Sequence, residues 1–82
     1  MIDRARTPQQ IGQALRAARR EKGLSQTELA SLSGQRQELI SKIESGSPGT
    51  SISAIFALLA ALGLELVLRP RFGAAPDIED VF

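Results

Sequence analysis

The sequence predicts one small all-α domain of four short helices, followed by a single C-terminal β-strand. Three observations lead to this prediction. Apolar residues recur at helical spacing in four segments between residues 7 and 63. Each segment is bounded by Ser, Thr, Pro or Gly, the residues that begin and end helices. Residues 64–69, with leucine at every second position, stop at Pro70, and this alternation is typical of a strand.

The first helix is predicted to begin after Thr7. Thr7 can cap the helix, Pro8 suits the first helical position, and Gln10 completes a capping box. Gly23 lies just past the end of the pattern, as glycine often does after a helix. The apolar stripe of this helix consists of Ile11, Ala14, Leu15 and Ala18.

Two shorter helices follow. Ser25 opens the second helix with Glu28 as its capping-box partner, and the pattern stops at Ser33 and Gly34. The third helix is expected from about Arg36 to Glu44. Its inward positions are Ile40 and Ile43.

The fourth helix is expected over residues 52–62, capped by Thr50 or Ser51 and ended by Gly63. It is the most apolar segment of the chain. Helices shorter than about a dozen residues are marginal in water without tertiary support. The four helices must therefore pack on one another.

Residues 64–69 form the only good strand pattern in the chain, and nothing else in the sequence can pair with it. An unpaired strand exposes a row of backbone donors and acceptors. Two copies of the chain could satisfy them by pairing antiparallel across a two-fold axis. Alternatively, the segment is a loop that packs on its own helix. The predicted dimer interface comprises Leu64, Leu66, Val67 and Leu68, with Val67 packed less deeply than the leucines.

Composition excludes several classes of protein. The 82 residues include no Cys and no His, so we expect no disulfide, no metal and no cofactor. Catalysis would need paired carboxylates, and the acids are scattered, so an enzyme is not expected. The first residues lack the apolar run of a signal peptide. The apolar-rich stretch 52–68 is too short and too interrupted to span a bilayer. We therefore expect a cytoplasmic protein.

Charge is unevenly distributed although the net charge is only +1. Lys and Arg outnumber Asp and Glu over residues 1–46, whereas residues 73–82 contain Asp77, Glu79 and Asp80 and no base. This pattern predicts a basic body that could meet nucleic acid, followed by an acidic tail.

The second and third helices have the spacing of a helix-turn-helix unit, in which a tight turn containing Gly joins two short helices. Ala30 is small where the third helix would cross closely. Gly34 gives the turn a backbone that tolerates left-handed angles. Ile40 would fill the angle between the helices. The spacing of these three residues predicts a helix-turn-helix unit of the kind that binds DNA.

In such units the second helix enters the major groove and its N-terminal residues meet base edges. Arg36 could pair with guanine and Gln37 with adenine. The predicted base contacts are Arg36, Gln37, Glu38, Ser41 and Lys42. Among them, Glu38 lies nearer the margin of the outward face of the third helix. The predicted phosphate contacts are Arg16, Arg20, Lys22, Gln26 and Gln35. The alternative is an ordinary helical bundle with a solvated polar face.

Glu44 stands at the end of the third helix, within reach of Arg19 on the first. We expect an Arg19–Glu44 ion pair with a structural role. The alternative for Arg19 is a phosphate contact.

The stretch LSQTELASLSGQRQELISKIESG resembles the Cro/CI-type helix-turn-helix of phage repressors and bacterial Xre-type regulators. The resemblance covers residues 9–62 and implies that the helix from Arg36 reads an operator. Ser33 and Glu38 depart from the common pattern, which has an apolar residue before the glycine and a neutral contact residue. The matching residues are Gln26, Glu28, Leu29, Ala30, Gly34, Ile40, Glu44 and Gly46.

The stretch FALLAALGLELVLRPR further resembles HipB-like antitoxins of bacterial toxin–antitoxin modules. The resemblance implies that the strand forms an intersubunit sheet in a homodimer. It also implies a partner, a HipA-like serine/threonine kinase toxin, which the antitoxin binds and inhibits while the complex represses its own operon. A two-fold dimer would place two reading helices roughly 34 Å apart on a palindromic, double-stranded operator. We accordingly expect the protein at the nucleoid.

Two other functions remain open from the residues alone: a stand-alone dimeric Xre-type repressor, and an interaction adaptor that does not bind DNA. The domain boundaries we expect are a flexible arm over 1–6, the helix-turn-helix domain over 7–63, the dimerisation strand over 64–70 and a flexible acidic tail over 71–82. Ile78, Val81 and Phe82 could anchor that tail on a basic toxin surface. Alternatively, the tail marks the chain for proteolysis or has no role.

Overall fold

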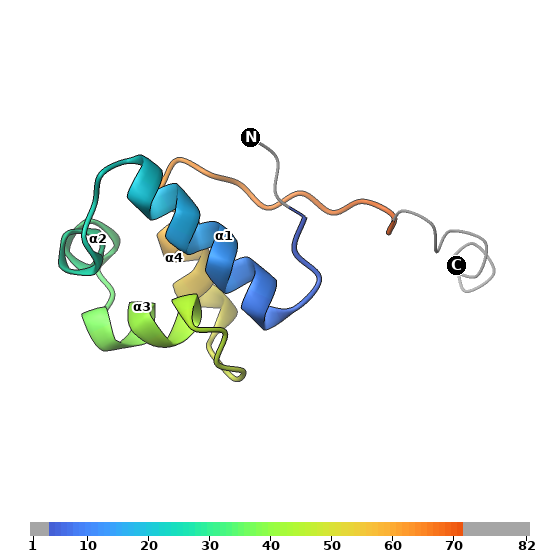
Figure 1. The fold of residues 1–82 in the computed structure, drawn as a ribbon, viewed down its shortest axis with the longest axis horizontal. Helices are drawn as coiled ribbons and strands as arrows, with labels where there is room; N and C mark the ends of the chain where they lie inside the picture. Colours follow the sequence, from blue (N-terminus) through green and yellow to red (C-terminus); the bar gives the residue numbers. More distant parts are fainter. Residues whose placement is uncertain (1–3, 72–82) are drawn as a thin grey trace.

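The computed structural model describes residues 4–71, which contain four helices in the order α1 (Pro8–Glu21), α2 (Gln26–Ser33), α3 (Gln37–Glu44) and α4 (Ile52–Ala61) (Figure 1). The predicted all-α arrangement of four helices is confirmed, and each helix end lies close to its expected residue. The first three residues of the arm, and the tail from residue 72 onward, lie outside the described residues.

Side-chain caps explain where three of the helices begin. The Thr7 Oγ1 atom accepts the Gln10 N–H at 3.1 Å, and Ser51 Oγ accepts the Ala54 N–H at 3.1 Å. Ser25 and Glu28 form the reciprocal capping box expected at α2. At α1 the Gln10 side chain accepts the N–H of Arg6 instead of that of Thr7, so the expected box is only half formed.

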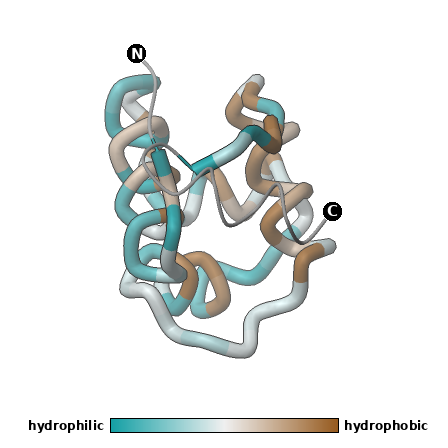
Figure 2. The backbone as a smooth tube through the Cα atoms, turned by 90° about the vertical axis from the view of Figure 1, so that its right-hand side faces the viewer, coloured by the Kyte–Doolittle hydropathy of each residue, from teal (hydrophilic) through white to brown (hydrophobic). Residues whose placement is uncertain are grey.

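The helices surround one core. In it, α1 packs against α3, while α2 packs against both α3 and α4. Figure 2 shows that α4 is apolar along most of its length, whereas α1 carries more hydrophilic positions. This packing holds α3 by its inward side and leaves its outer side exposed. The buried core residues are Leu15, Leu29, Ile40, Ile43, Ala54, Leu58, Leu59 and Leu62.

A glycine sets how closely α1 approaches α3. A Cβ atom added at Gly12 would overlap the carbonyl oxygen of Ile43 and lie 2.9 Å from that of Glu44. Only a residue without a side chain allows this contact. Nothing in the local sequence pattern separates Gly12 from an ordinary helix position, so no role was predicted for it.

The prediction of a strand over residues 64–69 is not met in the single chain, because residues 64–71 adopt no regular secondary structure. A strand requires a hydrogen-bonding neighbour, and no other segment of the described chain provides one. The segment runs outward from the end of α4 (Figure 1). The leucines of the expected dimer interface are exposed to different degrees in the single chain, Leu64 at 43%, Leu66 at 44% and Leu68 at 87%. Val67 is 65% exposed.

Within residues 4–71, no helix has both the length and the apolar character needed to cross a membrane.

Candidate nucleic-acid interface

The turn between α2 and α3 has the geometry of a helix-turn-helix. Gly34 ends α2 in the left-handed conformation, with φ of 72°, and its N–H donates to the carbonyl oxygen of Ala30 at 2.9 Å. Ala30 is partly buried against the core, and Ile40 is fully buried. All three residues therefore occupy the places that their spacing predicts.

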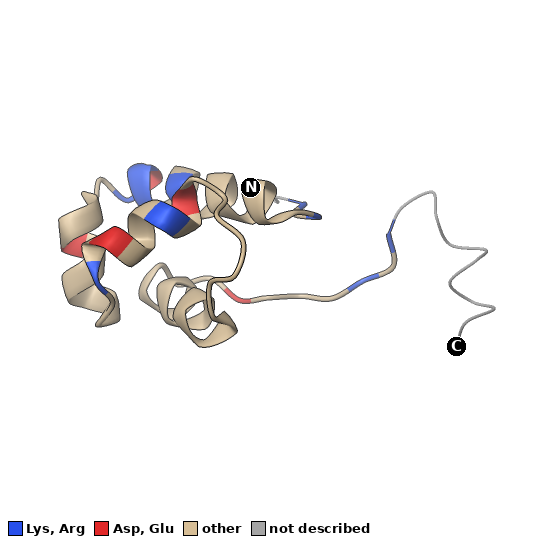
Figure 3. Ribbon diagram, turned by 90° about the horizontal axis from the view of Figure 1, so that it is seen from below, with Lys and Arg blue, Asp and Glu red and all other residues tan. Residues whose placement is uncertain are grey.

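The outer face of α3 presents the residues predicted to contact bases. Ile40, Ile43 and Glu44 are buried, so they fix which side of the helix faces inward. In Figure 3, which views the molecule from below, basic and acidic positions alternate along α3. Five polar residues at the start and along the outer side of this helix are exposed: Arg36, Gln37, Glu38, Ser41 and Lys42.

The predicted phosphate contacts fall into two groups. Arg16, Arg20 and Lys22 are exposed at α1 and its end, where their charges are free to attract phosphate. Gln26 and Gln35 are partly buried. The backbone N–H of Gln35 points to Ser33 Oγ at 3.3 Å, so this donor already has a partner within the turn.

Gln26 takes part in a side-chain network that was not predicted from the sequence. Its Nε2 donates to Glu44 Oε1 at 3.1 Å, and its Oε1 accepts the Nε2 of Gln37 at 2.8 Å. Gln26 on α2 therefore holds the side chain of Gln37, and Glu44 at the end of α3 holds Gln26. The only signal for this arrangement in the sequence is that each glutamine stands near the start of a predicted helix.

The network ends in the expected ion pair between Arg19 and Glu44. The Arg19 Nε and Nη2 atoms donate to the two carboxylate oxygens at 2.7 and 2.9 Å, a bidentate arrangement. The remaining Nη1 donates to the carbonyl oxygen of Leu24 at 2.8 Å. Both residues are only 7% exposed. The pair therefore ties α1 to α3 inside the domain.

The pair changes the acidity of both groups. The hydrogen bond to Glu44 raises the pKa of Arg19, although burial opposes the shift. For Glu44, burial favours the neutral acid, but hydrogen bonds from Arg19 and Gln26 and the charges of Arg19 and Arg16 outweigh it. The pKa of Glu44 therefore lies below its ordinary value. Both groups are charged at neutral pH, as a stable ion pair requires.

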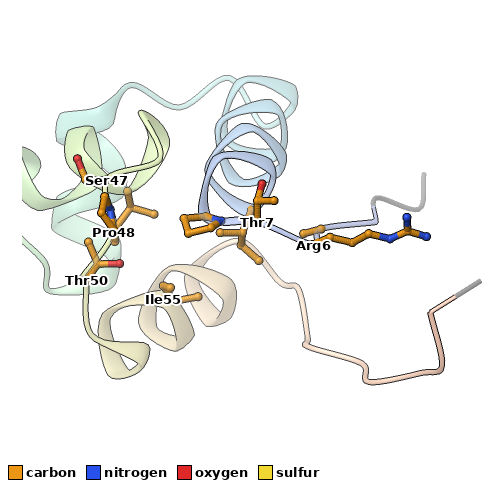
Figure 4. A pocket seen from close by; sticks show the side chains of 11 residues that line it. Arg6, Thr7, Ser47, Pro48, Thr50 and Ile55 are labelled. Carbon is orange, nitrogen blue, oxygen red and sulfur yellow. The ribbon is translucent and has the colours of Figure 1, made fainter. Parts of the chain in front are cut away.

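A cavity of about 350 Å³ lies elsewhere, near the start of α1 and the loop before α4 (Figure 4). Ile11, Ile43 and Ile55 supply apolar lining, while Thr7 and Thr50 supply hydroxyl groups. The described residues that line it include no carboxylate. This cavity therefore does not offer the paired acids needed for acid–base catalysis.

A helix-turn-helix whose second helix exposes Arg, Gln, Ser and Lys defines a class of DNA-binding proteins. Comparison with known proteins agrees with this class and identifies the family within it. The sequence profile of the helix-turn-helix family matches residues 15–68, more than half of the chain. The protein belongs to this family and is homologous to the antitoxin HipB.

Among its relatives, antitoxin HipB of Escherichia coli O6:H1 is 32% identical over 71 residues, covering 87% of this chain and 76% of the relative. The HTH-type transcriptional regulator y4mF of Sinorhizobium fredii is 35% identical over 71 residues, covering 85% of this chain and 93% of that protein. These relatives are named as an antitoxin and a regulator rather than as enzymes.

Solved structures show the same relationship. A chain of an O2 20mer complex of a HipB variant superimposes with a TM-score of 0.79 at 28% identity, covering 85% of this chain and 97% of that chain. A chain of a HipA-HipB-O2-O3 complex has a TM-score of 0.77 at 29% identity, with 84% and 97% of the two chains covered. The four-helix fold is therefore that of HipB.

Proposed function

We propose that this protein is a DNA-binding antitoxin that represses its own toxin–antitoxin operon as a dimer and neutralises a HipA-like serine/threonine kinase toxin. The observation that carries the proposal is the extent of the similarity to HipB. It reaches 87% of this chain, which includes residues beyond those of the DNA-binding helices. On this proposal the protein is not an enzyme, and it acts in the cytoplasm on nucleoid DNA.

The DNA-binding half of the proposal rests on α3. Arg36 reads guanine, Gln37 reads adenine, and Glu38, Ser41 and Lys42 complete the base contacts. Arg16, Arg20 and Lys22 attract the phosphate backbone from α1. Gln26 is the first residue of α2, and Gln35 lies in the turn between α2 and α3. This arrangement is supported by the exposure of the outer face of α3. It is also supported by the burial of Glu44, which keeps this negative charge off that face.

The dimer is supported by apolar surface that the single chain leaves uncovered. Leu64, Leu66, Val67 and Leu68 are all exposed in the segment after α4. Ile52 and Phe56 on α4 are exposed as well, at 65% and 46%. We assign residues 64–70 to an intersubunit sheet, in which backbone pairing with a second copy supplies the strand that one chain lacks. Such a dimer reads a palindromic operator.

The toxin-binding half is supported by the likeness to a chain of the HipA-HipB-O2-O3 complex. The second candidate, a stand-alone dimeric repressor, is supported by the comparable likeness to the regulator y4mF, of which this chain covers 93%. The two functions share the DNA-binding half and differ in the presence of a kinase partner.

Co-purification from the host tests the difference. The full chain and a variant lacking residues 73–82 are each captured from lysate, and bound protein and DNA are identified. A near-stoichiometric protein identified as a HipA-like kinase supports the antitoxin. Its loss on truncation assigns the toxin contact to the acidic tail. Recovery of operator DNA without a kinase supports the repressor.

DNA binding is tested separately with Arg36→Ala and Lys42→Ala. We expect both variants to bind a selected duplex more weakly while keeping their thermal stability, because both side chains are exposed. Unchanged affinity in both would favour the remaining alternative, an interaction adaptor that does not bind DNA.

A further inference from the structure

The segment that follows α4 carries a charge pattern that dimerisation alone does not explain. Leucines stand at 64, 66 and 68, while Glu65, Val67 and Arg69 occupy the alternate positions. Residues 64–71 are extended away from the helices and exposed. Within the described residues, neither Glu65 nor Arg69 forms an ion pair. The segment therefore has an apolar side and a side with one acid and one base.

The leucines restrict how two copies can align. In an antiparallel pair, residues directly opposite each other point to the same face of the sheet. A register that sets an even-numbered residue against an odd-numbered one would mix Leu66 with Glu65 or Arg69 of the partner subunit. One apolar face forms only when even numbers meet even and odd numbers meet odd.

The charges select among the remaining registers. With Leu66 opposite Leu66 of the partner subunit, Glu65 faces valine and Arg69 faces glycine. With Glu65 opposite itself, or Arg69 opposite itself, like charges meet and repel. With Val67 opposite Val67 of the partner subunit, each Glu65 lies directly across from an Arg69. This register creates two symmetry-related ion pairs. With Leu68 opposite Leu68 of the partner subunit, Glu65 would also meet a base, Arg71, but Pro70 would then stand inside the ladder opposite Leu66 and Val67 would face Arg69.

Pro70 agrees with the register centred on Val67. There Pro70 lies opposite Leu64 of the partner subunit, at the end of the ladder. Proline has no N–H to donate and is tolerated where the ladder needs no donor. Hydrogen-bonded and non-hydrogen-bonded pairs alternate along antiparallel strands. If the Val67 pair exchanges hydrogen bonds, the Glu65–Arg69 pairs do so too, and Pro70 occupies a position that needs none.

We infer that two copies of this chain pair antiparallel through residues 64–69 with Val67 at the two-fold axis, so that Glu65 of each copy meets Arg69 of the other. This inference rests on the proposed dimer and adds its register. The two ion pairs flank the Val67 pair on the outer face, and the leucines share the inner face.

The register has a functional consequence. Moving one strand by two residues relative to the other displaces it by roughly 7 Å. The two copies of α3 would shift with it. Because successive major grooves are spaced by one turn of DNA, the Glu65–Arg69 pairing helps set which half-site spacing the dimer fits.

Cysteine cross-linking tests the register, and the chain is suited to it because it contains no cysteine. Full-length Val67→Cys and Leu66→Cys are each oxidised at a concentration where the protein is dimeric. Paired Cα atoms about 5.5 Å apart lie within disulfide range, whereas diagonal neighbours are too far apart. We expect Val67→Cys to form a covalent dimer and Leu66→Cys to remain largely uncross-linked.

If Leu66→Cys forms the covalent dimer and Val67→Cys does not, Leu66 lies on the two-fold axis. That result would overturn the proposed register and keep the dimer. Efficient cross-linking of both variants would indicate parallel, in-register strands and would also overturn it. A protein that sedimentation shows to be monomeric would overturn the dimer of the proposed function together with its register.

Charge reversal supplies a second, independent measurement. Glu65→Arg or Arg69→Glu alone sets like charges opposite each other, and we expect the dimer dissociation constant to rise roughly tenfold. The double variant restores opposite charges and should recover the original value. If the double variant shows the sum of the two single losses, Glu65 and Arg69 do not face each other. Circular dichroism of each variant checks that the helices remain folded.

Discussion

The first residue of α3 is hydrogen-bonded to the first residue of α2, because Gln37 Nε2 donates to Gln26 Oε1 at 2.8 Å. Gln26 is held in turn by Glu44, whose carboxylate is paired with Arg19. The side chain proposed to read adenine is therefore positioned before DNA arrives. Binding then costs less side-chain entropy than it would for a free glutamine.

Replacing Gln26 by Ala should weaken binding to a selected duplex roughly fivefold, because the hydrogen bond that orients Gln37 contributes about 1 kcal/mol. The effect should largely disappear in a Gln37→Ala background, as measured by a double-mutant cycle with fluorescence anisotropy. Gln13→Ala, on the exposed side of α1, serves as the control. Equal losses in both backgrounds would mean that Gln26 acts on DNA independently of Gln37.

Lys42 is exposed on the outer side of α3, where we propose that it contacts a base. We expect Lys42→Ala to weaken binding to a selected duplex while the slope of log K against log salt concentration stays nearly unchanged. The measurement is a salt titration of binding to one fixed duplex. A slope reduced by about 0.9, the value for one phosphate contact on duplex DNA, would instead assign Lys42 to a phosphate.

Glu38 places a negative charge in the first turn of the reading helix. A carboxylate can accept a hydrogen bond from the amino group of cytosine. We therefore expect selection from randomised duplexes to enrich a cytosine that the Glu38→Gln variant no longer prefers. Glu38→Asp is the matched control, since it keeps the charge at the helix start but shortens the reach. Identical motifs for all three proteins would limit Glu38 to a helix-stabilising role.

The Arg19–Glu44 pair predicts how stability depends on pH. Because the pKa of Glu44 is lower in the folded protein than in the unfolded chain, its contribution is complete above the unfolded value. That contribution is lost as the pH falls below about 4.5 and through the lowered folded value. Urea unfolding at a series of pH values should show a steeper acid loss for the wild type than for Glu44→Gln.

Removing one partner of this pair leaves the other buried without compensation. Glu44→Ala should lower the free energy of unfolding by about 3 kcal/mol. An apolar replacement of both residues, Arg19→Met with Glu44→Leu, should recover much of the loss because no buried charge remains. If the double variant is no more stable than Glu44→Ala, the loss of stability comes from the packing of the two side chains and not from an uncompensated buried charge.

Gly12→Ala should destabilise the domain even though alanine is the better helix former by about 1 kcal/mol. The new Cβ overlaps the Ile43 carbonyl oxygen, so α1 and α3 must move apart. We expect a net loss of about 2 kcal/mol in thermal unfolding. Gly34→Ala is a useful comparison, since its Cβ would meet no atom within 4 Å and only its positive φ resists the change. A stabilised Gly12→Ala variant would show that the α1–α3 contact adjusts freely.

Local information was enough to predict the helices and much of the candidate surface. Thr7, Ser25 and Ser51 mark helix starts because a cap bonds to backbone only three residues away. The inward side of α3 follows from the spacing of Ile40 and Ile43, and the exposed residues follow from it. The role of Gln26 was not predictable in this way, because its partner Glu44 lies 18 residues along the chain.

The sequence by itself determined where each helix begins and ends, which face is apolar and that residues 64–69 favour an extended conformation. These properties depend on hydrogen bonds and side-chain periodicity within a few residues. Only the tertiary structure decided that α1 touches α3 at Gly12, that Gln26 turns inward to Glu44 and that the extended segment has no partner within the described part of one chain. Each of these depends on which distant atoms come together, and for residues 64–69 the partner we propose belongs to a second molecule.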